Sequence, residues 1–157
     1  MNLAVAAPTW LYAVLLTFLA AGAIEDMARL RISNLTCFAI ALLAIIAMFV
    51  VGPDWTLWQN GVVFAAILAV GTLAFGAGII GGGDVKFLAA VGLWVSLKTA
   101  ALLLAAIFLA GGVIAILAML FWQFRKTDSS STRTRQIPYG TAIAVGAAMV
   151  FQFARAG

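Results

Sequence analysis

The chain has 157 residues, of which 66% are hydrophobic and only 9% are charged, and its net charge is +4. Soluble domains are roughly half apolar and about a quarter charged, so this composition excludes an ordinary soluble protein. The chain has no histidine and one cysteine, which excludes Ser-His and Cys-His nucleophiles, HExxH zinc sites and paired-cysteine zinc knuckles. We therefore expect an all-α integral membrane protein with no metal or other cofactor.

The first apolar segment runs from about Trp10 to Ile24, and a polar link from Glu25 to Asn34 follows it. The segment lacks the positively charged start of a signal peptide, so we interpret it as the first transmembrane helix. Within the link, Ser33 or Asn34 is placed to cap the next helix. We expect that helix from about Leu35 to Val51, with Cys37 buried in it.

A turn at Gly52-Pro53-Asp54 precedes the third helix, which is expected from about Leu57 to Ala77. Asp54 is predicted to be solvated or to start that helix. Indole rings favour the boundary between lipid headgroups and hydrocarbon. We therefore place the tryptophans near the helix ends at such boundaries: Trp55, Trp58 and Trp94.

The stretch from Gly76 to Gly83 contains five glycines, too many for a regular helix, because each glycine costs about 1 kcal/mol relative to alanine. We predict an irregular turn there. The next segment, Asp84 to about Val95, would span about 18 Å as a helix. That is less than the roughly 30 Å of a hydrocarbon core, so the fourth helix is expected to be short.

A fifth helix is expected from about Thr99 to Phe124, with Gly111-Gly112 as a close-packing or bending point. The polar stretch from Arg125 to Gln136 reads as a solvated link. A sixth helix begins near Ile137 and continues to about Ala154. The predicted architecture is a single domain over residues 1–157: a compact bundle of six transmembrane helices with a glycine-rich break before a short helix 4.

Charge predicts the orientation of this bundle. With six helices, seven basic residues fall on one side of the membrane and two, Lys98 and Arg155, on the other. The positive-inside rule assigns the richer side to the cytoplasm, which leaves both termini periplasmic in a bacterial inner membrane. The seven are Arg29, Arg31, Lys86, Arg125, Lys126, Arg133 and Arg135.

The same topology brings Asp26, after the first helix, and Asp84, before the fourth, to one face of the membrane. Ionisable groups at membrane depth are costly and usually functional. Two neighbouring carboxyl groups cannot both ionise easily, so they share a proton; one can take a proton from water while the other donates to a carbonyl. This pattern indicates aspartic-protease chemistry.

The other acidic residues, and each member of the pair taken alone, have simpler interpretations. Asp84 could cap a helix with Lys86 nearby, and Asp26 could be a cap or pair with Arg29. Glu25 could substitute for Asp26 or attract a basic substrate. Asp128 belongs to the polar loop.

Three motifs in order carry a family resemblance. Gly81-Gly82-Gly83-Asp84-Val85-Lys86 resembles the GxGD signature of the type IV prepilin peptidases, which are intramembrane aspartyl proteases. The residues from Asp26 to Asn34, ending in Arg31-Ile32-Ser33-Asn34, are similar to the family's first aspartate motif. Ile137-Pro138-Tyr139-Gly140 is similar to the entry to its last helix.

This resemblance implies that Asp26 and Asp84 are the catalytic pair and that the substrates are prepilins and pseudopilins, from which a short basic leader is removed at the cytoplasmic face. Larger members of the family carry two CxxC pairs and also methylate the product. This chain lacks those cysteines and is similar instead to the small peptidases of Flp, or tight-adherence, pili. The expected substrate-binding or site-supporting residues are Gly81, Gly83, Lys86, Glu25, Arg31, Asn34, Pro138, Tyr139 and Gly140.

Two other functions remain open from the sequence. A small proton- or ion-translocating subunit could use Asp26 and Asp84 as a relay, and a non-enzymatic assembly scaffold would leave them as caps. Besides the substrate, the lipid bilayer is the expected partner; a nucleic-acid partner is not expected, and the oligomeric state is open. In the catalytic hypothesis, the glycines before Asp84 are an open surface on which an extended peptide approaches the carboxyl group.

Overall fold

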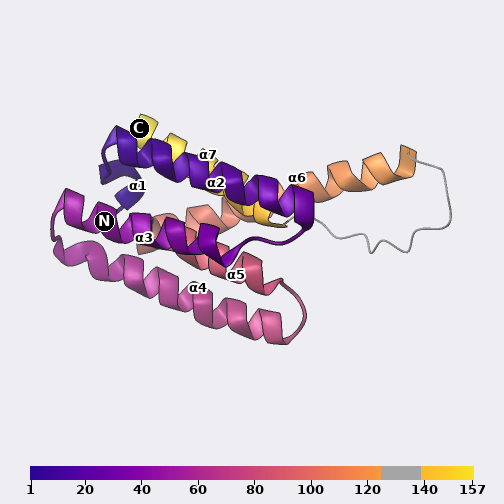
Figure 1. The fold of residues 1–157 in the computed structure, drawn as a ribbon, viewed down its shortest axis with the longest axis horizontal. Helices are drawn as coiled ribbons and strands as arrows, with labels where there is room; N and C mark the ends of the chain where they lie inside the picture. The colour runs from indigo at the N-terminus through magenta and orange to yellow at the C-terminus, as the bar shows by residue number, and fades with distance from the viewer. Residues whose placement is uncertain (125–138) are drawn as a thin grey trace.

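The computed structural model describes residues 1–124 and 139–157. Over these ranges the chain is helical and contains no strand, which confirms the predicted all-α class (Figure 1). The elements are α1 (Leu3–Ala6), α2 (Thr9–Arg29), α3 (Asn34–Val51), the 3-10 helix η1 (Trp55–Leu57), α4 (Trp58–Gly76), α5 (Gly82–Gly92), α6 (Leu97–Phe124) and α7 (Tyr139–Ala156).

The predicted number of membrane spans is not confirmed. The described residues form seven α-helices, because the four-residue helix α1 precedes the six expected ones. Four segments are long and apolar enough to cross a membrane: α2, α3, η1 with α4, and most of α6. Helix α5 has 11 residues and is short, as predicted. Neither α5 nor α7 meets the length and hydropathy of a span, so the count of six transmembrane helices is not confirmed.

Helix α2 continues past the predicted end at Ile24. It includes Glu25 and Asp26 and stops only at Arg29, so these two acidic residues lie on a helix rather than in a link. Leu30 ends the helix in the left-handed conformation, with φ of 53°. The non-helical link then reaches Ser33, whose hydroxyl accepts a hydrogen bond from the backbone N–H of Thr36 and caps α3, as predicted.

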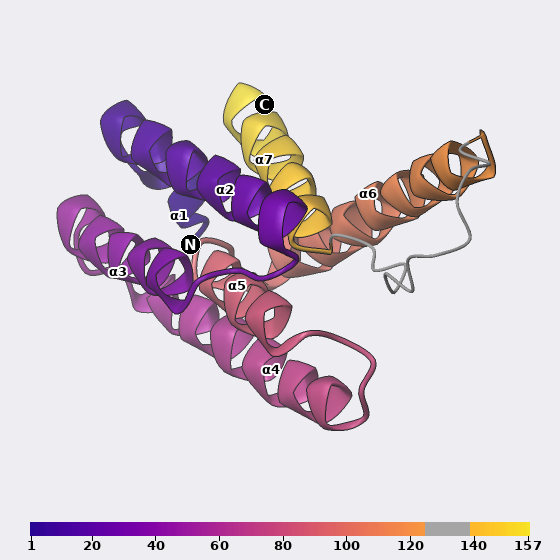
Figure 2. The ribbon, with the colours of Figure 1, turned by 45° about the vertical axis from the view of Figure 1, so that its right-hand side comes forward.

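Glycines allow the helices to approach closely. A Cβ on Gly71 of α4 would lie 2.6 Å from Val85 of α5, and one on Gly146 of α7 would lie 2.8 Å from the backbone of Ile107 in α6. Such small residues at helix contacts are typical of membrane bundles. Helix α5 lies beside both α3 and α4 (Figure 1), whereas Figure 2 shows α6 diverging from α4.

Polar contacts hold together the end of the bundle where both termini lie (Figure 1). Arg155 of α7 donates to the carbonyls of Ala4 and Ala7, and the Ala4 N–H donates to the carbonyl of Trp94. Asn60 of α4 donates to the carbonyl of Leu93. At this end hydrogen bonds therefore join α7 to α1, and they join α1 and α4 to the residues that follow α5.

The prediction for Trp94 was wrong. Its side chain is fully buried, and its indole N–H donates to the carbonyl of Ile40 in α3, 3.2 Å away. Trp55 and Trp58 are exposed, with 91% and 55% of their surface accessible, as a headgroup-boundary position requires. Burial of Trp94 is possible because Ile40 supplies the acceptor that an indole N–H needs in an apolar environment.

Candidate active site

Asp26 lies on the last turns of α2, at the end of the bundle away from the termini. Only 4% of its surface is exposed. Its Oδ2 atom accepts a hydrogen bond from the backbone N–H of Thr141, at 2.9 Å, and lies 3.4 Å from the Thr141 hydroxyl. Thr141 follows Tyr139-Gly140 in the first turn of α7. The start of α7 therefore supplies a donor that fixes one oxygen of the Asp26 carboxyl group.

Asp84 is the third residue of α5, after Gly82 and Gly83. It lies outside the four candidate spans. The pKa of Asp84 is raised to about 6, chiefly by burial and secondly by the charge of Asp26, while a hydrogen bond from the Gly81 backbone acts against this rise. The carboxyl group thus reaches back to the residue before the helix, as in a capping box. Asp84 therefore supports the helix start, although the N-cap residue is Gly81 and the expected partner Lys86 donates to Asn34 instead. This role does not remove Asp84 from the neighbourhood of Asp26, whose charge still acts on its pKa.

A helix contact one turn deeper aligns the two carboxyl groups. A Cβ on Gly22 would lie 2.7 Å from the ring of Phe87, so α2 and α5 touch there. Asp26 follows Gly22 by four residues, and Asp84 precedes Phe87 by three, so each aspartate shares a helix face with its contact residue. Because the two helices run in opposite directions, both aspartates lie at the same end of this contact.

Ile32, in the link after α2, lies against both parts of the site. A Cβ on Gly83 would lie 3.5 Å from the backbone of Ile32, and one on Gly140 would lie 2.5 Å from Ile32 Cδ1. The side chain is 8% exposed. The space beside Gly83 is therefore filled by the chain itself, and the expected open glycine surface is absent at that position. A Cβ on Gly140 would also lie 3.0 Å from the carboxyl carbon of Asp26.

Glu25 fixes the link that contains Ile32. Its carboxylate accepts a hydrogen bond from the backbone N–H of Ser33, at 2.9 Å, and from the hydroxyl of Thr36, at 3.0 Å. These bonds join the end of α2 to the start of α3. The Glu25 carboxylate is thus occupied by the chain, and its predicted role in supporting the site stays a prediction.

The remaining predicted site residues lie around the pair of Asp26 and Asp84 or outside the described residues. Lys86 donates to Asn34 Oδ1 at 3.0 Å, which joins α5 to α3. Arg31 is exposed on the link, and Gly81 lies so close that a Cβ there would be 2.8 Å from Asp84 Oδ2. Pro138 lies outside the described residues, as do Asp128 and the basic residues between 125 and 135.

Asp54 lies at the opposite end of the bundle. Its carboxylate accepts hydrogen bonds from the backbone N–H and the hydroxyl of Thr56, which lower its pKa and cap η1. The prediction that Asp54 starts a helix is confirmed. This carboxylate is far from Asp26 and Asp84, because Thr56 also accepts a hydrogen bond from the amino group of Met1.

Sequence reasoning missed three residues that position the carboxyl groups: Gly22, Ile32 and Thr141. Ile32 lies within the motif from Asp26 to Asn34, and Thr141 directly follows the motif that ends at Gly140. The sequence therefore marks both regions but does not indicate what these two residues contact. No pattern marks Gly22, because its contact with Phe87 depends on how two distant helices cross.

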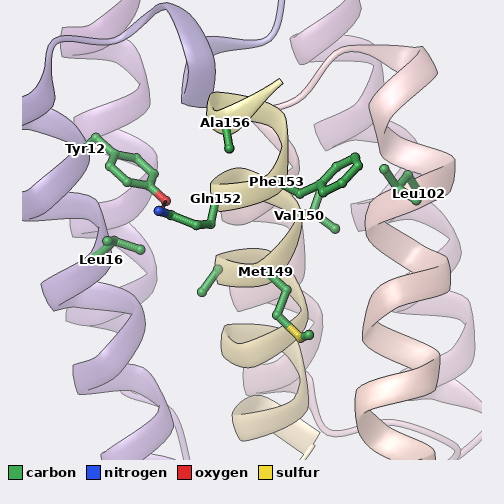
Figure 3. Close-up of a pocket in the computed structure, with 9 residues that line it drawn as sticks. Tyr12, Leu16, Leu102, Met149, Val150, Gln152, Phe153 and Ala156 are labelled. Atoms are coloured by element: carbon green, nitrogen blue, oxygen red, sulfur yellow. Dashed lines mark hydrogen bonds between the residues drawn. The ribbon is translucent and has the colours of Figure 1, made fainter.

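An apolar cleft of about 420 Å³ opens beside Asp84, between α4, α5, α6 and α7. Tyr139 and Asp84 line it together with apolar side chains and three glycines. A second hollow, of about 840 Å³, lies between α2 and α7 toward the other end, where Tyr12 donates to Gln152 Oε1 (Figure 3). The second hollow has no carboxylate in its lining.

The arrangement suits general acid-base chemistry. One oxygen of Asp26 is held by Thr141, which leaves the other to take a proton from water. Asp84, with a pKa of about 6, can hold a proton near neutral pH and donate it. Two neighbouring carboxyl groups with different environments are the pattern from which acid and base roles are assigned.

Comparison with known proteins agrees with this geometry. The model of the type IV leader peptidase family matches residues 13–116, about two thirds of the 157-residue chain, and the match contains both Asp26 and Asp84. A search of curated proteins gave no match, and a search of solved structures gave none. Since the family match covers more than half of its length, the chain belongs to the type IV leader peptidase family.

Proposed function

We propose that this protein is an intramembrane aspartyl endopeptidase that removes the short basic leader peptide of Flp-type prepilins and pseudopilins. The observation that carries the proposal is the meeting of Asp26, on α2, with Asp84, on α5, at one end of a bundle of apolar helices. Family membership supports a peptidase of leader peptides. The Flp-type substrate is what the resemblance of this sequence to the small prepilin peptidases of Flp pili implies.

The proposed mechanism uses the two carboxyl groups in different protonation states. Asp26, as carboxylate, takes a proton from a water molecule whose oxygen attacks the scissile carbonyl carbon. Asp84, as carboxylic acid, gives its proton to the carbonyl oxygen, and a tetrahedral diol forms. The diol then returns a proton to the amide nitrogen through the pair, the C–N bond breaks, and the carboxyl groups regain their starting states.

The placement of the two carboxylates argues against the relay alternative. A proton or ion path would need ionisable groups along the bundle. Asp26 and Asp84 both lie at one end, and the opposite end carries Asp54, which is exposed and bonded to Thr56. The pair is therefore better suited to local chemistry than to transfer across a membrane.

The test is co-expression with a prepilin that has a short basic leader, followed by gel-shift detection of leader removal. Asp26→Asn and Asp84→Asn should each reduce processing by about 10²- to 10⁴-fold, the range for general acid-base groups. Asp54→Asn is the matched control, because it removes a carboxylate at the other end of the bundle and should leave processing intact. Normal processing by either site variant, at equal protein level, would contradict the catalytic assignment.

We also propose that the carboxylate end faces the cytoplasm, with both termini periplasmic and six helices in the bilayer. Among the described residues, Arg29, Arg31 and Lys86 lie at the carboxylate end, and Lys98 and Arg155 lie at the other. The test uses a Cys37→Ala background with Arg31→Cys or Trp55→Cys, both at exposed positions. A membrane-impermeant maleimide added to intact spheroplasts should label the Trp55 position alone; labelling of only the Arg31 position would reverse the orientation.

A further inference from the structure

The apolar cleft beside Asp84 has a defined length and polarity. Among the residues that the structure describes, Asp84 is the only charged one in its lining. On α6, the lining extends from Leu104 to Ala115, which is about 16 Å along a helix axis at 1.5 Å per residue. This is about half of a hydrocarbon core of roughly 30 Å. Tyr139 and Asp84 lie at the carboxylate end, and Leu104 lies at the deeper end, because α6 runs toward the carboxylate end.

The volume of the cleft fits one face of a helix rather than a whole helix. A helix 16 Å long and about 10 Å across occupies roughly three times the 420 Å³ of the cleft. A bound helix would therefore place one face between α4 and α6 and leave the other outside. Gly112 makes room for this contact: it lines the cleft, and a Cβ built on it would meet nothing within 4 Å.

We propose that this cleft binds the apolar helical segment that follows the scissile bond of the peptide substrate, with the basic leader lying beyond Asp84. The inference rests on the proposed function for the identity of the substrate. Its geometric basis is continuity, because the carboxyl group proposed to act on the peptide bond also forms one end of an otherwise apolar cleft.

Charge distinguishes this occupant from a lipid. In the proposed mechanism the pair of Asp26 and Asp84 carries one negative charge, and this charge at the mouth of the cleft attracts a lysine-containing leader and repels the phosphate of a phospholipid headgroup. The apolar part of the lining accepts a side-chain face of Leu, Ile, Val or Phe residues by burial of apolar surface. The single negative group therefore sets the direction in which an amphiphilic peptide lies in the cleft.

Cross-linking tests the position of the substrate directly. The probe is a synthetic peptide with a short lysine-containing leader and about 20 apolar residues, with one cysteine in the apolar part. The full chain in liposomes, with Cys37→Ala, carries Gly112→Cys or the matched control Gly61→Cys. Gly61 also has open space at its Cβ position but does not line the cleft. Cross-links at position 112 with little at position 61 support the proposal; equal yields, or none at position 112, overturn it.

Kinetics provide a second test that does not depend on cross-linking chemistry. Gly112→Leu places a side chain in the cleft at a position with open space for its Cβ atom. It should raise the KM for this peptide about tenfold with little change in kcat, as expected when ground-state and transition-state binding are lost equally. Gly61→Leu should have no effect, and a peptide with its apolar part cut to a few residues should be insensitive to Gly112→Leu. An unchanged KM overturns the proposal and points to a lipid in the cleft.

Cleavage and cross-linking together distinguish a failure of the cleft assignment from a failure of the proposed peptidase function. If wild-type protein cleaves the peptide but no cross-link forms at position 112, the cleft assignment fails and the proposed function stands. If the protein does not cleave the peptide but cross-links at position 112 exceed those at position 61, the peptidase proposal fails for this peptide and the cleft still binds an apolar helix.

Discussion

A Cβ on Gly140 would lie 3.0 Å from the carboxyl carbon of Asp26, so the first turn of α7 touches the carboxyl group without an intervening side chain. The neighbouring Thr141 N–H reaches Asp26 Oδ2 because of this close approach. Gly140→Ala should therefore displace Asp26 and the flexible end of Ile32. We expect a loss of cleavage of about 10²-fold, the effect of a misplacement of about 1 Å, with little loss of thermal stability.

Gly146 on the same helix provides the contrast. A Cβ there would lie 2.8 to 2.9 Å from backbone atoms of Ile107, which cannot move as a side chain can. Gly146→Ala should lower the free energy of unfolding by about 1 to 3 kcal/mol, as overpacking does. Cleavage rates per folded molecule and melting temperatures in detergent distinguish the two variants. Equal loss of stability in both would show that Gly140 has only a packing role.

The titration of Asp84 predicts how stability depends on pH. Its pKa is raised from 3.8 to about 6 in the folded chain, so between these values the folded state binds the proton and the unfolded state releases it. The contribution of Asp84 to the free energy of unfolding therefore falls as the pH rises from about 4 to about 6, and it is constant above that. Asp84→Asn should remove this dependence. Thermal unfolding of both proteins between pH 4 and 7.5 is the measurement, and parallel curves would contradict the raised pKa.

Substitutions of Glu25 should loosen the link after α2 in proportion to the number of hydrogen-bond acceptors that they remove. Glu25→Ala removes the acceptor of both the Ser33 N–H and the Thr36 hydroxyl, whereas Glu25→Gln keeps one carbonyl oxygen. A partly exposed hydrogen bond to a charged group contributes about 1 kcal/mol. Cleavage should therefore fall in the order wild type, Glu25→Gln, Glu25→Ala, because Ile32 loses its fixed position. Equal and complete loss in both variants would instead indicate that the Glu25 charge takes part in the reaction.

Replacement of Leu30 by glycine should stabilise the folded chain. It ends α2 with φ of 53°, a conformation that glycine adopts freely and that costs other residues about 1 to 2 kcal/mol. Its side chain is 41% exposed, so Leu30→Gly loses little burial. We expect a gain of about 1 kcal/mol in the free energy of unfolding. As a control, Leu35→Gly in α3, where the side chain is 75% exposed, should cost about 1 kcal/mol; a loss in both variants would exclude strain at Leu30.

The helices and the meeting of the two aspartates were predictable, because both follow from the length and order of apolar segments. The second, third and fifth helices were predicted within about two residues of their observed ends. The extension of α2 to Arg29 was not, since Glu25 and Asp26 interrupt the apolar pattern although both tolerate a helix. A helix end that is placed by hydropathy marks the residue at which the apolar side chains stop, and the helical backbone can continue beyond that residue.

The support of the site was less predictable, because it depends on contacts between segments that are distant in sequence. Ile32 fills the space beside Gly83, and Trp94 is buried because Ile40 offers its carbonyl. Neither contact has a local signature. A glycine beside a catalytic residue has the same sequence appearance whether its neighbour is a substrate or another part of the chain.

At the carboxylate end Glu25 and Lys86 join helices by hydrogen bonds, and other hydrogen bonds join helices near both termini. Arg155, Trp94 and Asn60 fix neighbouring helices to one another at that end. At the other end, the contacts with Asp26 and Asp84 involve the link after α2 and the turn before α5, which are short and non-helical. We therefore expect the backbone amides of this link and this turn to exchange hydrogen with solvent faster than the amides of the helices that they connect.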